Sequence, residues 1–400
     1  MKLAERRVLR DPIHGYIQIE DDVIWKLIDS IPMQRLKRIR QLGGVGQVYH
    51  TAEHSRFSHS LGVYEIFRRI CAEVPGVNET LGEDWRTAGL CAALLHDLGH
   101  GPFSHGYEAI SHVDHEAITQ KLILDEKGDV CRILEAERPG LARRTAAILA
   151  HESECPLAEE LISSQLDCDR MDYLLRDAYE TGTSYGHFDL ERILRTLRVK
   201  DGHLAVKKSG MHSVEDYIMA RYQMYWQVYL HPDAYGYDLL VQTFFGRYKI
   251  LRENPAFRHP LLEAIFEPFF PERFLELDDF SVLSAISSMQ KAEDSILRDL
   301  AGRIVNRRLF GWQTCSEEAS SKRVDAMLKA GYDPAWYFHI RTISNEEYRP
   351  YSETKAPIRI LEGETILPLS QASVVVRSLL SMPLDATTRM YYPKDGQEKF

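Results

Sequence analysis

The stretch LLHDLGHGPFSH, residues 94–105, carries the pattern that decides the fold of this chain. An apolar run leads into it and predicts a buried helix that ends near His96 and Asp97. Adjacent histidine and aspartate side chains can give one metal ion a nitrogen and an oxygen ligand. Burying three histidines and an aspartate without partners costs on the order of several kcal/mol, so a purely structural cluster is the less favoured interpretation.

Histidines gather in the first third of the sequence and extend this cluster. Eight of the 16 histidines lie at residues 50–115. Upstream of His96, the segment RFSHSLG places His59 at the start of another predicted helix. Downstream, LDCDRMDYLLRD offers Asp169, and helix phase alone leaves Asp167 as an alternative. Two histidines and two aspartates suit a divalent metal with positions open for water and substrate.

Hydrophobic periodicity predicts a mainly helical protein with small β hairpins and a small α+β C-terminal part. A short strand is expected at residues 13–19, and Asp201–Gly202 marks a hairpin between two alternating runs. Helices are expected from residue 24 and at 32–42, 59–74, 84–100, 115–124, 131–137, 157–180, 213–230, 238–251, 280–309 and 317–330. Strands are expected within 356–369 and 386–393. We assign residues 1–310 to one domain, with its metal-binding core at about 50–180, and residues 311–400 to a region for assembly or gating.

The composition is that of an ordinary globular protein. The 400 residues are 44% hydrophobic and 27% charged, and the formal net charge is -10. This acidity disfavours nucleic-acid binding as the main role, although the basic run QRLKRIR leaves a weak local affinity open. No apolar run approaches the ~18–20 residues that span a bilayer, so no membrane partner is expected. Six scattered cysteines without a C-x-x-C pair favour reduced thiols and a cytoplasmic location.

The chain contains, in this order, the segments RDPIHGYIQI, QRLKRIRQLGG, HSRFSHSLGV, HDLGHGPFSH and QLDCDRMDYLLRD. Together they resemble the deoxynucleoside triphosphate triphosphohydrolases (dNTPases) of the HD superfamily, over about residues 5–310. That group includes bacterial enzymes and a human enzyme that joins a sterile-alpha-motif domain to an HD domain. The resemblance implies an HD-domain helical core with one divalent metal (Mg, Mn, Fe, Co, Ni or Zn). The implied metal ligands are His59, His96, Asp97 and Asp169.

The resemblance also implies a reaction and the residues that perform it. Enzymes of this family attack the α-phosphate of a dNTP and release a deoxynucleoside and intact triphosphate. The implied catalytic set is His105, Glu108 and His115, with glutamate standing at position 108 where the family has aspartate. The residues implied to contact the substrate are Gln41, Leu42, Arg56, His100, Arg170, Tyr173, Asp177, Arg221, Tyr225 and Tyr229.

Two groups of these expected site residues recur at helical spacing. Asp169, Tyr173 and Asp177 recur at every fourth residue and therefore share one helix face. Arg221 and the two tyrosines that follow it, ending at Tyr229, repeat the same spacing. Spacing alone favours core aromatics for these two tyrosines, whereas the resemblance implies that Tyr229 crowds the ribose 2′ position and selects deoxyribose.

Family members of this type are often tetramers that GTP, dGTP or another dNTP activates at subunit interfaces. The matching regulatory positions in this chain are Val8, Asp29, Gln34, Lys37, Arg192, Lys207 and Arg307. Taken singly, each of them is explained equally well as an ordinary solvated surface residue. The resemblance therefore implies a homo-oligomer, a tetramer or dimer, with an allosteric nucleotide site.

Two other classes of function stay open on the sequence. Another HD-type phosphohydrolase, a nucleotidase or phosphodiesterase for monophosphates, cyclic nucleotides or alarmones, needs the same four ligands but not the arginine and tyrosine set. A nucleotide- or nucleic-acid-binding protein is motivated by the basic run at residues 34–40 and disfavoured by the acidic balance. The sequence has no Walker A segment, which disfavours ordinary ATPase chemistry.

Overall fold

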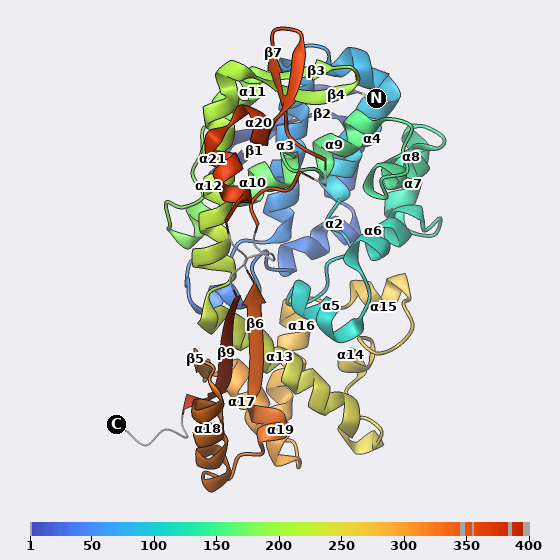
Figure 1. Ribbon diagram of the computed structural model, residues 1–400. Helices are drawn as coiled ribbons and strands as arrows, with labels where there is room; N and C mark the ends of the chain where they lie inside the picture. Colours follow the sequence, from blue (N-terminus) through green and yellow to red (C-terminus); the bar gives the residue numbers. More distant parts are fainter. Residues whose placement is uncertain (1, 345–348, 354–355, 383–385, 395–400) are drawn as a thin grey trace.

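The computed structural model describes residues 2–344, 349–353, 356–382 and 386–394, and for His105 only the backbone. Helices dominate the described part of the chain, and small sheets lie toward two ends of the molecule (Figure 1). This confirms the expected mainly helical fold with small β hairpins and an α+β C-terminal part.

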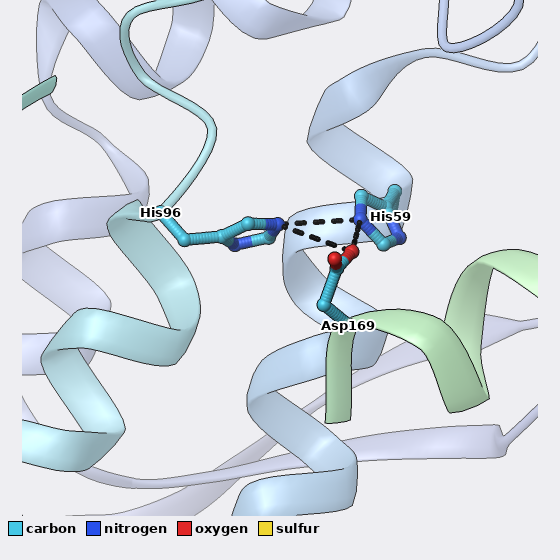
Figure 2. A group of neighbouring side chains, drawn as sticks. All are labelled: His59, His96 and Asp169. Carbon is cyan, nitrogen blue, oxygen red and sulfur yellow. Dashed lines mark hydrogen bonds and ion pairs between the residues drawn. The ribbon is translucent and has the colours of Figure 1, made fainter. Parts of the chain in front are cut away.

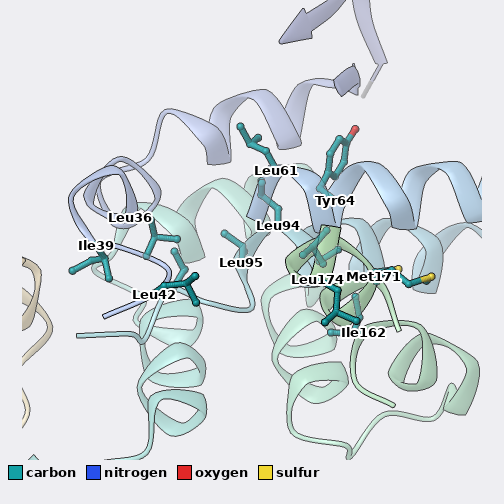
Figure 3. Packing of buried hydrophobic residues seen from close by; sticks show 14 of the residues in the cluster. Leu36, Ile39, Leu42, Leu61, Tyr64, Leu94, Leu95, Ile162, Met171 and Leu174 are labelled. Carbon is teal, nitrogen blue, oxygen red and sulfur yellow. The ribbon is translucent and has the colours of Figure 1, made fainter. Parts of the chain in front are cut away.

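Three helices pack together around the predicted site, and we call them the central helices: α3 (Arg56–Glu73), α4 (Val77–Leu95) and α10 (Cys168–Thr181). Their apolar faces meet in a core in which Leu61, Leu94 and Met171 are buried (Figure 3). Gly89 lets α3 and α4 approach closely, because a Cβ atom there would lie only 2.2 Å from Cζ of Phe67. The apolar run of the sequence is thus the buried second half of α4, and two of the predicted metal ligands, His96 and Asp97, follow directly after its last residue.

The interpretation of residues 157–180 as one long helix is wrong. The structure has two helices there, α9 (Pro156–Ile162) and α10, separated by residues 163–167. The Asp167 side chain caps α10, because it accepts hydrogen bonds from the backbone N–H groups of Ser164 and Arg170, both at 2.7 Å. The new helix start places Asp169 in the first turn of α10.

The amphipathic helix expected at residues 32–42 is shorter than predicted. Helix α2 (Ile31–Arg35) and one 3-10 turn (Leu36–Arg38) end before Ile39, whose backbone is extended. The next residues pair with the segment before α3, since the Arg56 N–H donates to the Ile39 carbonyl at 2.9 Å. This tertiary pairing overrides the helical pattern and brings Gln41 beside the start of α3.

The strand expected at residues 13–19 is confirmed from residue 15 onward, as β2 (Gly15–Asp21), which pairs antiparallel with β1 (Lys2–Asp11). Strand β1 was not expected, because most of its residues are exposed and it lacks an alternating apolar pattern. The β1–β2 hairpin lies against α3, where the Tyr64 hydroxyl donates to the Gln18 carbonyl at 3.0 Å.

The hairpin predicted at Asp201–Gly202 is confirmed. Both residues have positive φ, 53° and 78°, as a type I′ turn between β3 (Leu197–Lys200) and β4 (His203–Lys207) requires. Strand β4 also pairs in parallel with β7 (Arg359–Glu362), which forms a hairpin with β8 (Thr365–Pro368). This sheet therefore joins segments that are about 150 residues apart in the sequence.

The second small sheet has the order β5 (Phe310–Thr314), β9 (Ala386–Pro393) and β6 (His339–Ser344). Figure 1 shows this sheet at the opposite end of the molecule from β7. The chain therefore runs from β6 to β7 at the other end and then back to β9. The strands expected within residues 356–369 and 386–393 are confirmed. The division of the chain at residue 310 stays a prediction.

The remaining helices are α1 (Asp22–Ile28), α5 (His105–Ser111), α6 (His115–Leu124), α7 (Asp129–Glu137), α8 (Leu141–Leu149), α11 (Leu190–Thr196), α12 (Met211–Met224), α13 (Pro232–Leu251), α14 (Pro260–Glu263), α15 (Pro271–Leu275), α16 (Asp279–Ser288), α17 (Ser295–Val305), α18 (Glu317–Lys329), α19 (Pro334–Tyr337), α20 (Leu369–Ala372) and α21 (Val374–Leu380). The single helix expected at 280–309 is two, because Asp294 caps a new start at α17. A π-helical turn (Tyr225–Tyr229) follows α12. Within the described ranges, every helix is too short or too polar to cross a membrane.

Candidate active site

Four side chains from the central helices meet at the end of the core, and we call them the metal cluster: His59, His96, Asp97 and Asp169. The Nε2 atom of His59 lies 2.9 Å from Asp169 Oδ1 and 3.3 Å from His96 Nε2 (Figure 2). One Asp97 oxygen lies 3.3 Å from His96 Nε2, and the other lies 3.9 Å from His59 Nε2. The structure thus brings all four predicted ligands together, and it places Asp169 rather than Asp167 beside the histidines.

Both histidines of the metal cluster are oriented by a partner on their other ring nitrogen. The Nδ1 atom of His96 lies 3.0 Å from the Ala93 carbonyl, and the Nδ1 atom of His59 lies 2.8 Å from Asp172 Oδ2. Because a carbonyl and a carboxylate accept hydrogen bonds, each Nδ1 donates and each Nε2 is left as a metal-binding lone pair. Two imidazoles and two carboxylates oriented in this way fit a single divalent metal.

The electrostatics of the metal cluster favour a bound cation. Burial opposes a charge on His59, but hydrogen bonds to Asp169 and Asp172 raise its pKa to about 10. Burial would raise the pKa of Asp169, yet His59 and His96 hold it below its usual range. The carboxylates therefore stay ionised in the core and stabilise positive charge between them, whether protons on the imidazoles or a metal ion.

A buried arginine adjoins the metal cluster. Arg56, the first residue of α3, donates from Nη1 to Asp97 Oδ2 at 2.7 Å and from Nε to Ser104 Oγ at 3.0 Å. Burial would raise the pKa of Asp97, but Arg56 and His96 hold it well below its usual range. The guanidinium is thus a fixed positive charge that also faces the cavity described below.

Two further histidines stack beside Arg56. The rings of His100 and His115 lie 3.9 Å apart between centroids, with an interplanar angle of 23°. Burial, together with the charge of Arg56, lowers the pKa of His100 well below its usual value. Burial also opposes a charge on His115, but its Nδ1 is hydrogen-bonded to Glu108, which raises its pKa. The side chain of His105 lies outside the described part of the structure, so its catalytic role stays a prediction.

Three aromatic side chains, which we call the tyrosine wall, border the same cavity: Tyr173, Tyr225 and Tyr229. Tyr229 meets the rings of Tyr173 and Tyr225 edge-on, with centroid distances of 6.2 and 5.2 Å. The Tyr229 hydroxyl donates to Asp177 Oδ2 at 2.8 Å, and the other Asp177 oxygen lies 2.7 Å from Nε2 of the buried His54. A histidine–aspartate–tyrosine chain therefore fixes the middle ring of the wall.

A cavity of about 410 Å³ connects the metal cluster to the tyrosine wall. The predicted site residues that line it are Gln41, Leu42, Arg56, His96, Asp97, His100, His115, Asp169, Tyr173, Asp177, Tyr225 and Tyr229. Arg170 and Arg221, expected to contact the substrate, lie outside this lining. Arg170 Nε lies 3.2 Å from Asp167 Oδ2, and Arg221 Nη1 donates to the Pro350 carbonyl at 3.0 Å.

The seven expected regulatory residues lie at least partly exposed on several elements: Val8, Asp29, Gln34, Lys37, Arg192, Lys207 and Arg307. Lys37 Nζ donates to Gln34 Oε1 at 2.8 Å, and Arg192 Nη2 donates to the Ser209 carbonyl at 2.9 Å. Arg307 donates to the Gln47 carbonyl. These are contacts of ordinary surface side chains, and the regulatory role stays a prediction.

Several polar residues of this region were not predicted from the sequence, among them His54, Asp172 and Asp238. His54 holds Asp177, and Asp172 holds His59; both stand in segments that carried the resemblance, but their partners depend on the tertiary fold. Asp238 on α13 lines the cavity, where burial raises its pKa to about 7 although a hydrogen bond from the Gly44 N–H opposes this. Its sequence context, an apolar helix, gave no signal.

Comparison with known proteins agrees with this geometry. The HD domain family model matches residues 56–177, from Arg56 to Asp177, and a model of the HD associated region matches residues 188–235. The first match spans the metal cluster and the three central helices that hold it. The chain belongs to the HD-domain family.

The relatives match most of the chain, to different extents. An uncharacterized protein of Bacillus subtilis (strain 168), YwfO, is 42% identical over 98% of this chain and 94% of its own length. The SAMHD1 homolog of Dictyostelium discoideum, a deoxynucleoside triphosphate triphosphohydrolase, is 28% identical over 76% of this chain and 59% of its own length. The crystal structure of a phosphohydrolase from Bacteroides thetaiotaomicron superimposes with a TM-score of 0.86 at 27% identity, covering 98% of this chain and 100% of that one.

Proposed function

We propose that this protein hydrolyses deoxynucleoside triphosphates to a deoxynucleoside and inorganic triphosphate. The observation that carries the proposal is the single cavity that joins the metal cluster, the buried Arg56 and the tyrosine wall. Its volume of about 410 Å³ is in the range of small-molecule binding sites. The relatives named deoxynucleoside triphosphate triphosphohydrolases support the same substrate class.

One divalent metal is the proposed cofactor, with Mg, Mn, Fe, Co, Ni and Zn as candidates. The metal cluster would hold it through two imidazole nitrogens and two carboxylates. When bound, such a metal supplies Lewis acidity toward a phosphoryl oxygen and a nearby water.

The side chains beside the metal cluster are proposed to neutralise the charge of the phosphates and to transfer protons. Arg56 neutralises phosphate charge from a position that Asp97 and Ser104 fix before substrate arrives. His115 is hydrogen-bonded to Glu108 through Nδ1, so its Nε2 is the atom that gives or takes a proton. His105 completes the proposed catalytic set. His100, stacked on His115, contacts phosphate.

The tyrosine wall is the proposed sugar site. The Tyr229 ring cannot swing aside without breaking the hydrogen bond of its hydroxyl to Asp177, so it limits the room beside the ribose 2′ position. Gln41 and Leu42 line the same cavity and are proposed to contact the sugar. Tyr173 and Tyr225 line the same cavity and are proposed to contact the rest of the nucleoside.

Regulation is a further part of the proposal. A homo-oligomer, a tetramer or dimer, would bind GTP, dGTP or another dNTP at its subunit interfaces. The proposed contact residues are Val8, Asp29, Gln34, Lys37, Arg192, Lys207 and Arg307. These side chains are at least partly exposed and belong to separate elements. This arrangement favours a nucleotide site that a neighbouring subunit completes over a pocket within one chain.

One observation favours a second candidate function. Arg170 is paired with Asp167 and Arg221 with a backbone carbonyl, so neither lines the cavity. Among the described residues, Arg56 is the one arginine or lysine that lines the cavity, so the site also suits an HD-type phosphohydrolase that acts on a nucleoside monophosphate or a cyclic nucleotide, which carries less charge.

Product analysis separates the two candidates. The metal-loaded protein is incubated with each dNTP, alone and with GTP or dGTP, and the products are separated by ion-exchange chromatography. Deoxynucleoside and triphosphate in equal amounts, absent with His96→Ala and Asp97→Ala, are the expected result. Hydrolysis of a monophosphate or cyclic nucleotide, with no turnover of any dNTP, would replace the first proposal by the second.

A further inference from the structure

The metal ligand His59 is held from behind by a buried polar contact that reaches the N-terminal hairpin. The Asp172 oxygen Oδ2 accepts from His59 Nδ1 at 2.8 Å, and the other oxygen lies 2.7 Å from His14 Nε2. His14 lies in the turn between β1 and β2. These three side chains are at most 2% exposed. One carboxylate therefore touches both a metal ligand and the turn of the hairpin.

Arg176 ties the same carboxylate to the hairpin a second time. Its Nε and Nη2 atoms donate to the two oxygens of Asp172, both at 2.9 Å. Its Nη1 atom donates to Asp11 Oδ2 at 2.9 Å, and Asp11 Oδ1 accepts from the backbone N–H of His14 at 3.0 Å. Because both ends of the turn are held, the position of the Asp172 carboxylate depends on how the hairpin is seated.

A glycine in the middle of α3 makes room for this network. A Cβ atom on Gly62 would lie 1.8 Å from Asp172 Oδ1 and 2.5 Å from Arg176 Nη2. Glycine inside a helix costs about 1 kcal/mol relative to alanine. Gly62 lies one turn after His59. Its cost to the stability of α3 is therefore offset by the room that it leaves for the Asp172 carboxylate.

We infer that the turn between β1 and β2 clamps the metal site, with His14 as a positioning residue that acts through Asp172 on His59. With the turn seated, Asp172 is fixed and His59 donates from Nδ1, which leaves Nε2 for the metal. With the turn displaced, Asp172 loses a donor, and His59 loses the partner that fixes its tautomer and ring orientation. The inference rests on the metal site of the proposed function but not on the identity of the substrate.

A matched pair of variants tests the clamp through metal affinity. Glutamine at position 14 places an amide N–H near the position of the histidine Nε2, whereas the shorter asparagine does not reach Asp172. Mn2+ is titrated into the metal-free 400-residue chain, with thermal unfolding as the check on folding. His14→Asn is expected to bind Mn2+ about 10–100-fold more weakly, as for other partners of metal ligands, and His14→Gln close to wild type.

The exposed Tyr16→Ala on the same hairpin is the control and is expected to bind Mn2+ like the wild type. Equal affinity of His14→Asn and wild type would overturn the inference. So would an equal loss in both position-14 variants and in the control, because that pattern reports general damage to the hairpin.

Hydrogen exchange tests the same clamp without any variant. By linkage, a turn that strengthens metal binding must itself be stabilised by the metal. We expect Mn2+ to slow amide exchange in residues 11–16 of the wild-type chain, and not in the distant β3–β4 turn at Asp201–Gly202. Unchanged exchange in residues 11–16 with metal bound would overturn this inference and leave the proposed function standing. If neither Mn2+ nor Zn2+ binds the wild type, the proposed function and the inference fail together.

Discussion

The metal cluster and the tyrosine wall border one cavity but are held in different ways. His59, His96 and Asp97 each have a second partner in the core: Asp172, the Ala93 carbonyl and Arg56. The tyrosine wall is held mainly by ring-edge contacts, together with the hydrogen bond that the Tyr229 hydroxyl donates to Asp177. Removing one charged group of the metal cluster leaves its buried partner unpaired, so we expect such a substitution to abolish the chemistry. Changing one ring of the tyrosine wall alters only the shape of the cavity, so we expect a graded effect.

This comparison is tested first by removing a ligand from the metal cluster. Asp97→Ala is expected to lower the rate of hydrolysis by about three orders of magnitude or more, because the metal and the partner of Arg56 are lost together. Metal content by mass spectrometry and initial rates are measured on the same sample. His212→Ala, at an exposed histidine, is the control. Full metal content and activity in Asp97→Ala would remove that residue from the site.

The next effect is expected at Arg56. Arg56→Ala is expected to lower kcat by about 10²–10³-fold, as for other preorganised groups that stabilise transition-state charge. It also leaves the buried Asp97 without its cation, so the free energy of unfolding should fall by about 1–3 kcal/mol. Arg56→Lys keeps the charge and should recover part of kcat. A change in KM alone would mean that Arg56 binds substrate without assisting the reaction.

A smaller effect is expected at the tyrosine wall, and it should change selectivity rather than rate. Tyr229→Ala opens space beside the sugar and should reduce the preference for a dNTP over the matching NTP by about 10–100-fold. Tyr229→Phe keeps the ring and loses only the hydrogen bond to Asp177, so it should retain most of the preference. Steady-state rates with paired substrates measure the ratio. An unchanged ratio in both variants would move sugar selection away from this wall.

The smallest effect concerns Asp238, which lines the cavity but belongs to neither group. Burial raises the pKa of Asp238 to about 7, above the usual range of an aspartate, so the folded state binds more protons than the unfolded state at pH values between that range and 7. The contribution of Asp238 to stability therefore falls as pH rises through this window. Asp238→Asn should gain stability relative to wild type between pH 5 and pH 8 in urea unfolding. Asp216→Asn, at an exposed aspartate, is the control, and parallel pH curves would contradict the assignment.

The four residues of the metal cluster could be selected from the sequence because each stands in a short motif of the family that the chain resembles, whereas helix phase alone left Asp167 open beside Asp169. The structure groups them because the central helices form the core. The partners Asp172, His54 and His14 could not be selected, since a buried polar contact depends on helices and turns that are far apart in the sequence.

The misread helices show the same limit. Residues 163–167 lie inside a continuous helical pattern, and the break there depends on the Asp167 side chain capping a new helix. Residues 39–41 leave the predicted helix because they find backbone partners next to Arg56. In both cases, hydrogen bonds that cannot be read from the sequence override the helical periodicity. The first change puts Asp169 in the first turn of α10, and the second brings Gln41 beside the start of α3.

The parallel pairing of β4 with β7 has a consequence for synthesis on the ribosome. Val206 pairs with Ile360, so the inner edge of β4 stays open until the ribosome has made some 150 further residues. At a translation rate of about 5–20 residues per second, this wait lasts on the order of ten seconds or more. During that time the nascent chain exposes an unpaired strand edge, which is a site for pairing with other chains. Cellular yield should therefore respond to chaperones that cover nascent chains, even where the finished protein is stable.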